Sequence, residues 1–190
     1  MRQAVWQALG SKVLVAAARE VARKSIVLLK NDGILPLDKT VRTVAVIGPL
    51  ADDKDAPLGN WRGRGQANSA VSLLEGVKAA VSPATRVIYA EGAKLVTGPR
   101  DFGTPSVYNT SDRSGFPAAV EAARSADVVL LAIGEDAYQS GEGRSQADIG
   151  LKGLQNELLR AIVAANKNTV VVLMSGRPLT IGDVAEAVPA

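Results

Sequence analysis

The sequence predicts an α/β fold, a three-layer α/β/α sandwich in which helices cover both faces of a mainly parallel sheet. Short runs of β-branched and aliphatic residues, typical of strands buried on both faces, alternate with segments rich in helix formers. The length of 190 residues and the hydrophobic fraction of 47% suit a single buried core. The predicted strands are Thr43–Ile47, Arg86–Tyr89, Val128–Ile133 and Thr169–Met174.

The N-terminal part of the sequence predicts one long helix followed by a strand. The helix covers Lys12–Lys30, because this segment is continuous in helix formers. Asn31-Asp32-Gly33 is a strong stop signal, after which residues 34–37 are expected to be extended. The strand Thr43–Ile47 then ends at Gly48-Pro49.

The middle of the chain continues the alternation of helices and strands. A helix is expected over Ser69–Val81 and a second over the alanine-rich segment Phe116–Ala126, which leads into the strand Val128–Ile133. Between them, the strand Arg86–Tyr89 is followed by a long Gly/Pro/Ser/Asp-rich stretch, Ala93–Gly115, that is typical of a loop. Right-handed crossovers between the strands then place all their carboxyl ends on one edge of the sheet.

The C-terminal part supplies one more predicted helix, Leu151–Asn166, and the strand Thr169–Met174. No helix is expected after this strand, where Arg177-Pro-Leu179 leads to the final residues Val188-Pro-Ala190. We therefore expect the domain to be truncated at its C-terminus.

Composition narrows the chemistry that this chain can perform. Histidine and cysteine are absent, which excludes disulfides, thiol nucleophiles, Ser-His-Asp triads and histidine- or cysteine-ligated zinc within the chain. Acid–base chemistry must therefore use carboxylates, lysine or tyrosine. Neither G-x-G-x-x-G nor G-x-x-x-x-G-K-[ST] occurs, so we expect no nucleotide cofactor. Without histidine or cysteine ligands, we also expect no metal.

Charge and hydropathy exclude two kinds of partner. The 22 basic and 19 acidic residues are dispersed, and aromatic residues make up only 4% of the chain, so no nucleic-acid partner is expected. No apolar run approaches the roughly 20 residues that span a bilayer, and the first ten residues lack the apolar stretch of a signal peptide. The sequence predicts a soluble chain, cytoplasmic as written, with no membrane partner.

The loop after the strand Val128–Ile133 contains a candidate catalytic carboxyl. Gly141 and Gly143 flank Glu142, and glycines with positive φ allow a loop to project such a side chain away from the scaffold. A projecting carboxyl suits a general acid/base that approaches a substrate held elsewhere. An ordinary solvated loop with a charged tip has the same pattern, and the residues alone do not separate the two interpretations.

The loop after the first strand contains Trp61 between glycines in a polar stretch. Sugar rings stack on indole faces, but the same tryptophan could instead pack its loop against the sheet. Asp52, Asp53 and Glu135, also at strand ends, could bind a polar ligand or cap a turn, and for the two aspartates the pattern favours capping.

Several motifs, taken in order, strongly resemble the second, α/β-sandwich domain of family 3 glycoside hydrolases, the β-glucosidase and β-xylosidase family. The resemblance covers residues 16–190, and residues 1–15 are expected to be a leader outside the family pattern. The motifs are Ala18–Asn31, Leu35–Leu37, Val44–Asp52, Gly59–Trp61, Ser140–Arg144 and Ser175–Leu179.

The resemblance implies that a (β/α)8 barrel, in cis or in trans, supplies an aspartate nucleophile that this chain lacks. Glu142 matches the acid/base glutamate of the family, and Trp61 matches an aromatic residue that helps wall the sugar subsite. By the same resemblance, Arg144 is expected to bind substrate. The implied reaction is retaining hydrolysis of β-linked oligosaccharides or aryl glycosides. The chain alone is then expected to be inactive, and the parent enzyme to be periplasmic or secreted.

Two other interpretations remain open at this point. The chain could be a non-catalytic α/β module that binds carbohydrate or another protein. An exposed sheet edge or apolar face could also pair it with a second copy of itself as a homo-oligomer.

Overall fold

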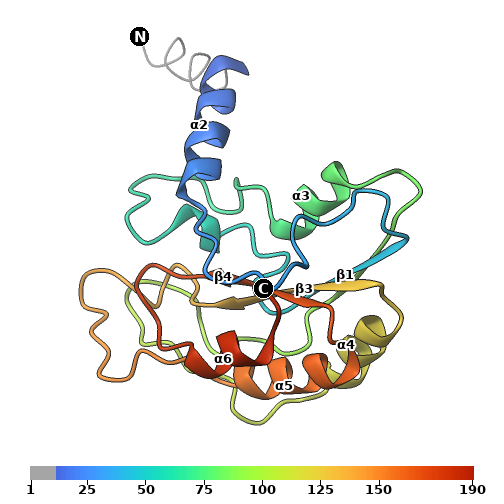
Figure 1. The fold of residues 1–190 in the computed structure, drawn as a ribbon. Coiled ribbons are helices and arrows are strands. Elements are labelled where there is room, and N and C mark those ends of the chain that lie inside the picture. The colour runs from blue at the N-terminus through green and yellow to red at the C-terminus, as the bar shows by residue number, and fades with distance from the viewer. Residues whose placement is uncertain (1–11) are drawn as a thin grey trace. The chain divides into compact units, whose positions relative to one another are not determined.

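The computed structural model describes residues 12–190 (Figure 1). They fall into two compact units, one ending at Lys30 and the other spanning Asn31–Ala190. Residues 1–11 of the expected leader lie outside the described part. The boundary predicted between residues 15 and 16 stays a prediction.

The first unit contains the helix α2, Lys12–Ser25, which is shorter than the predicted Lys12–Lys30. The Ser25 hydroxyl donates to the Ala22 carbonyl (2.8 Å), a local bond that competes with helix continuation. Ile26 and Val27 follow, and β-branched side chains lose rotamer freedom in a helix. These features account for the earlier helix end.

The second unit is built on a four-stranded parallel sheet of order β2-β1-β3-β4. β1 and β4 have the predicted bounds, and β2 and β3 each extend one residue further than predicted. All seven residues of β3 are buried, as expected for a central parallel strand. The strands are β1 (Thr43–Ile47), β2 (Arg86–Ala90), β3 (Val128–Gly134) and β4 (Thr169–Met174).

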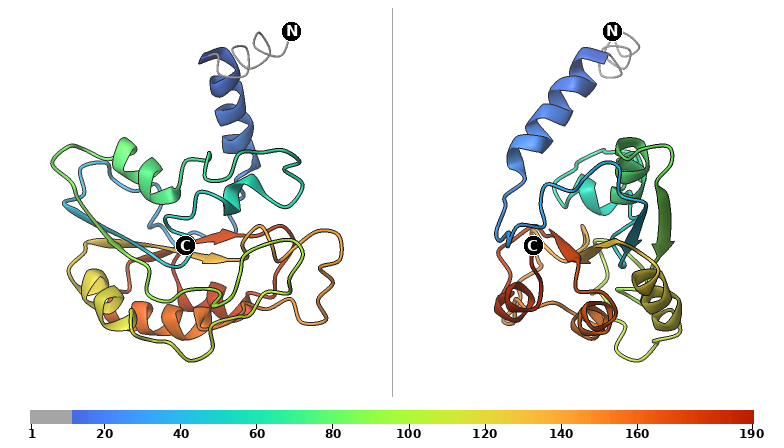
Figure 2. Two further views of the ribbon diagram at one scale, coloured as in Figure 1. Left: turned by 180° about the vertical axis from the view of Figure 1, so that it is seen from behind. Right: turned by 45° about the vertical axis from the view of Figure 1, so that its right-hand side comes forward.

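Helices cover both faces of this sheet, which confirms the predicted three-layer sandwich. Alternate strand residues point to opposite faces, so Ala45 and Ile47 join the core beneath α4, α5 and α6, whereas Val44 and Val46 pack with Leu74 of α3. Figures 1 and 2 show α4–α6 on one side of the sheet and α3 on the other. The helices are α3 (Leu73–Ala80), α4 (Phe116–Arg124), α5 (Gln155–Ala165) and α6 (Gly182–Ala187).

Helix α6 is a correction to the expectation that no helix follows the last strand. Its buried residue Val184, together with Ile181 and Val188, belongs to the core cluster beneath the sheet. The spacing of these three residues is that of one helical face, but the short segment between prolines obscures the pattern. The C-terminal residue also lies along the sheet edge, because Val171 N–H donates to the Ala190 carbonyl (2.8 Å).

Gln155, the first residue of α5, completes the hydrogen bonding at the end of β3. β1 pairs with β3 only as far as Leu131, so the end of β3 has no strand on that side. The Gln155 side-chain amide takes the place of that strand: its Oε1 accepts from Gly134 N–H (2.7 Å) and its Nε2 donates to the Gly134 carbonyl (2.9 Å). The start of the loop after β3 is thereby fixed.

Candidate active site

Glu142 lies at the tip of a tight turn in the loop that follows β3. Gly141 (φ +100°) and Gly143 (φ +71°) have the positive φ that favours glycine, and Arg144 N–H donates to the Gly141 carbonyl (3.1 Å). The Glu142 side chain is exposed. The turn thus presents a carboxyl at the surface, at the carboxyl-end edge of the sheet.

Trp61 lies in the loop after β1, on the same edge of the sheet. The residue is 75% exposed, so it does not pack its loop against the sheet. The preceding residue, Asn60, donates from Nδ2 to the carbonyl of Ser140 in the Glu142 loop. The indole and the carboxyl are therefore carried by two loops that are directly bonded to each other.

The guanidinium of Arg144 links two loops rather than standing free on the surface. Nη1 donates to the Thr104 carbonyl (3.1 Å) and Nη2 to the Asp101 carbonyl (3.1 Å), which joins the Glu142 loop to the loop after β2. The Arg144 carbonyl in turn accepts from Arg177 Nη2 (3.1 Å). These bonds give Arg144 a role in loop structure, and its predicted contact with substrate stays a prediction.

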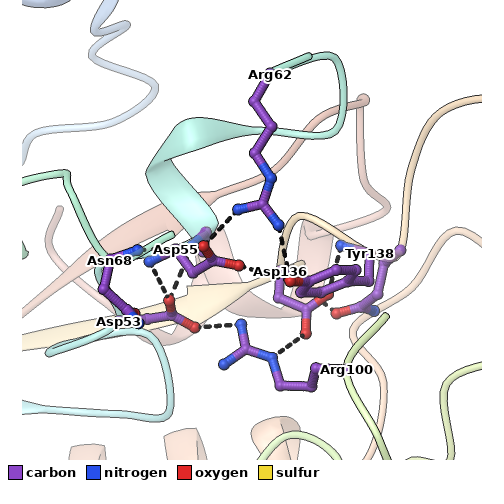
Figure 3. Close-up of polar contacts among 9 residues, drawn as sticks. Asp53, Asp55, Arg62, Asn68, Arg100, Asp136 and Tyr138 are labelled. Atoms are coloured by element: carbon purple, nitrogen blue, oxygen red, sulfur yellow. Dashed lines mark hydrogen bonds and ion pairs between the residues drawn. The ribbon is translucent and has the colours of Figure 1, made fainter. Parts of the chain in front are cut away.

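A largely buried triad that the sequence did not indicate joins the Trp61 loop to the Glu142 loop (Figure 3). Arg62 forms an ion pair with Asp55 and donates from Nη2 to the Tyr138 hydroxyl (2.8 Å), which itself donates to Asp55 Oδ2 (2.7 Å). The Arg62 guanidinium also lies over the rings of Phe102 and Tyr138. Its central carbon is 5.4 Å from the centroid of the Phe102 ring and 5.3 Å from that of Tyr138. Each member of the triad thus contacts both of the others.

Burial and hydrogen bonding set the protonation of this triad. Burial opposes the charge of Asp55, but the hydrogen bonds from Arg62 and Tyr138 outweigh it and lower the pKa of Asp55. For Tyr138, burial and the hydrogen bond to Asp55 raise the pKa of the phenol. Asp55 is therefore a carboxylate and Tyr138 a neutral hydroxyl near neutral pH.

A second arginine, Arg100, connects all three loops through acidic partners. It donates from Nη2 to Asp53 Oδ2 (2.5 Å) and from Nε to Asp136 Oδ2 (3.1 Å). Burial raises the pKa of Asp136, although Arg100 and the Tyr138 N–H favour its charge. Asp53 Oδ1 accepts from the N–H groups of Asp55 and Ala56 (both 2.8 Å), which confirms that Asp53 caps a turn.

Glu135 and Asp52, the other two acidic residues that the sequence singled out at strand ends, also have partners within the domain. Glu135 is buried and pairs with Arg177 (3.2 Å), and its burial raises the pKa of its carboxyl despite that arginine. Asp52 accepts from the hydroxyl of Ser72 (2.7 Å), the N-cap of α3. Among residues 12–190, no group of three or more acidic side chains is arranged to hold a metal ion.

A cavity of about 410 Å³ lies beside the Glu142 loop. Its lining combines apolar groups, such as Pro105 and Tyr108, with polar residues of the loop. The cavity is lined by residues 105, 106, 108, 138, 139, 143–148 and 152.

Comparison with protein families identifies the domain. The model of the glycosyl hydrolase family 3 C-terminal domain matches residues 26–190. The chain belongs to this family. Curated family 3 relatives include a periplasmic β-glucosidase of Salmonella typhimurium, 38% identical over 172 residues, and a β-xylosidase of Formosa agariphila, 36% identical over 179 residues. The alignments cover 86% and 91% of this chain but only 22% and 23% of those relatives.

Solved structures of family 3 enzymes contain the same fold. The β-glucosidase of Listeria innocua in complex with isofagomine matches 95% of this chain at a TM-score of 0.80 and 27% identity, over 23% of its own length. A family 3 exo-β-xylosidase in complex with a xylobiose aziridine probe matches 92% at a TM-score of 0.73 and 31% identity, over 21% of its length. This chain thus spans less than a quarter of these relatives.

None of the helices described in residues 12–190 is long and apolar enough to cross a membrane.

Proposed function

We propose that this domain contributes the general acid/base, Glu142, to a retaining β-glycosidase that acts on terminal β-glucosides or β-xylosides. The observation that carries the proposal is the pairing of an exposed carboxyl with an exposed indole on two bonded loops. Asn60, next to Trp61, donates to the carbonyl of Ser140, two residues before Glu142. An acid/base beside an aromatic sugar platform is the half-site that family membership leads us to expect.

In the proposed reaction, a (β/α)8 barrel in cis or in trans supplies the aspartate nucleophile. That aspartate attacks the anomeric carbon while Glu142 protonates the departing glycosidic oxygen, and a covalent glycosyl-enzyme forms. Glu142, now a carboxylate, removes a proton from the incoming water as this attacks the intermediate. Trp61 stacks on the sugar through its exposed face.

Only the docked barrel would complete the environment of Glu142. The carboxyl is exposed in this domain, and an acid that must be protonated near neutral pH gains that property from burial in a closed, partly apolar interface. We therefore expect this chain alone to be inactive, with residues 16–190 forming the functional domain. By analogy with the Salmonella relative, the enzyme would act in the periplasm.

The test is reconstitution of aryl β-glucoside and β-xyloside hydrolysis from this chain and a separately produced family 3 barrel. Replacing Glu142 with glutamine should lower kcat by about 10²–10⁴-fold, the usual contribution of general acid–base catalysis. Glu186→Gln is the matched control, because Glu186 is an exposed glutamate on α6, and it should leave the rate unchanged. Unaltered activity in Glu142→Gln would rule out the assignment.

A second candidate function, non-catalytic carbohydrate binding, is favoured by the 75% exposure of Trp61. Calorimetric titration of the chain alone with β-linked oligosaccharides distinguishes the two, because the heat of binding can be measured with and without the indole. Saturable binding that Trp61→Ala abolishes, combined with no activity in the presence of a barrel, would support the binding module. Turnover on addition of the barrel would support the glycosidase.

A further inference from the structure

Two arginines hold together the loops that carry Glu142 and Trp61 (Figure 3). Arg62, adjacent to Trp61, bonds to Asp55 and to Tyr138 of the Glu142 loop. Arg100 bridges Asp53 and Asp136, and so adds the loop after β2. The links are closed rings of contacts rather than single bonds, so they fix the spacing of the loops in more than one direction.

Stability alone does not explain why charged groups occupy this position. The side chains of Arg62 and Asp55 are only 12% and 10% exposed, and removing such charges from water costs about as much as their attraction returns. Well-packed apolar residues of the same volume often stabilise a fold equally well or better. What directional bonds add is a defined geometry, because each fixes a distance and an angle.

The presented groups need such support, because they have little packing of their own. Glu142 and Trp61 are both exposed, and a cavity of about 410 Å³ lies beside the Glu142 loop. A displacement of about 1 Å in a reacting group can lower a rate about 100-fold. A proton donor on such a loop is therefore sensitive to the bonds at the base of the loop.

We propose that Arg62, Asp55 and Tyr138 act as a positioning unit that sets the Glu142 loop against the Trp61 loop. The inference rests on the proposed function, because it assigns these residues no contact with substrate, only control over groups that have one. Tyr138 is the reporter of choice: its hydroxyl makes both polar contacts to the unit, and phenylalanine retains the ring on which Phe102 and Arg62 pack.

The first test uses the chain by itself and measures amide hydrogen exchange in residues 59–65 and 139–146. Tyr138→Phe and Arg62→Met should speed exchange about tenfold in both segments together, since both loops lose a shared link. The exchange rates of Arg62→Lys, which retains the charge, should lie between those of Arg62→Met and of the native chain. Arg113→Met is the control, because Arg113 makes two bonds of 2.7 Å to Glu157 elsewhere on the surface. The proposal is overturned if Tyr138→Phe speeds exchange in neither segment or in only one.

The second test uses the chain reconstituted with a barrel and compares two aryl glucosides. Tyr138→Phe should lower kcat/KM about tenfold for phenyl β-glucoside, whose leaving group needs protonation, and less than about twofold for 2,4-dinitrophenyl β-glucoside. A variant that was merely unstable would lower both values equally, and that result would overturn the proposal. Full activity in Glu142→Gln would instead refute the proposed function, while the exchange experiment would still decide whether the loops are coupled.

Discussion

Replacement of Gln155 by leucine should destabilise the domain by freeing the end of β3. The Gln155 amide accepts from Gly134 N–H (2.7 Å) and donates to the Gly134 carbonyl (2.9 Å) and the Lys152 carbonyl (3.1 Å). Leucine has nearly the same volume and fills the same space without any of these bonds. The change therefore isolates the hydrogen bonds from the packing.

The expected loss follows from the groups left without partners. Gly134 N–H and its carbonyl are buried with the rest of β3, and each buried backbone group without a hydrogen bond costs about 1–3 kcal/mol. The sum for the two groups is about 2–6 kcal/mol in the free energy of unfolding. With a urea dependence of about 2 kcal/mol per molar, the midpoint should fall by about 1–3 M.

Urea titration followed by far-UV circular dichroism measures this change. Asn156→Leu is the matched control, because Asn156 is the next residue of α5 and is exposed. Its free energy of unfolding should change by less than about 0.5 kcal/mol. The reasoning is refuted if Gln155→Leu unfolds at the native urea concentration. It is equally refuted if the control loses as much stability as Gln155→Leu.

Three further changes test the fold and its electrostatics. Gly48→Ala should lower the free energy of unfolding by about 3 kcal/mol or more, because Gly48 has φ +120° and a Cβ there would overlap the Ala132 carbonyl. A lower thermal midpoint would show this loss. Leu158→Ala should cost about 3–5 kcal/mol in urea unfolding, because Leu158 is fully buried in the core. The pKa of Asp55 lies below its ordinary 3.8 in the folded chain, so its charge stabilises the fold above that pH and the contribution is lost as pH falls through the lower value. Asp55→Asn should therefore reduce the thermal midpoint at neutral pH, and the difference between the variant and the native chain should narrow as pH falls below 3.8.

The strands were predictable because their signal is local. Runs such as Thr43–Ile47 and Thr169–Met174 are short, apolar and β-branched, and the structure gives both the predicted bounds. Helix ends were predicted less well, since side-chain caps decide them. Ser72 and Glu75 form a capping box that begins α3. The pattern S-x-x-E was visible in the sequence, three residues after the start of the over-extended prediction Ser69–Val81.

The candidate site was predictable only in part. Glu142 and Trp61 stand out locally, between glycines in polar loops. The groups that join those loops do not, because Tyr138 bonds to Asp55 across 83 positions and Arg100 to Asp53 across 47. Such partners meet only through the order of the strands. The usable signal was coarser: polar residues follow each strand at the shared edge, where loops from distant parts of the sequence converge.

The most direct measurement on Glu142 is product analysis with azide, using Glu142→Ala reconstituted with a family 3 barrel. 2,4-Dinitrophenyl β-glucoside needs no protonation of its leaving group, so the glycosyl-enzyme should still form and then persist without its general base. Azide is already an anion and attacks without a base, so it should raise the rate and yield β-glucosyl azide. No acceleration by azide, or the appearance of α-glucosyl azide, would contradict the role of Glu142 as the acid/base.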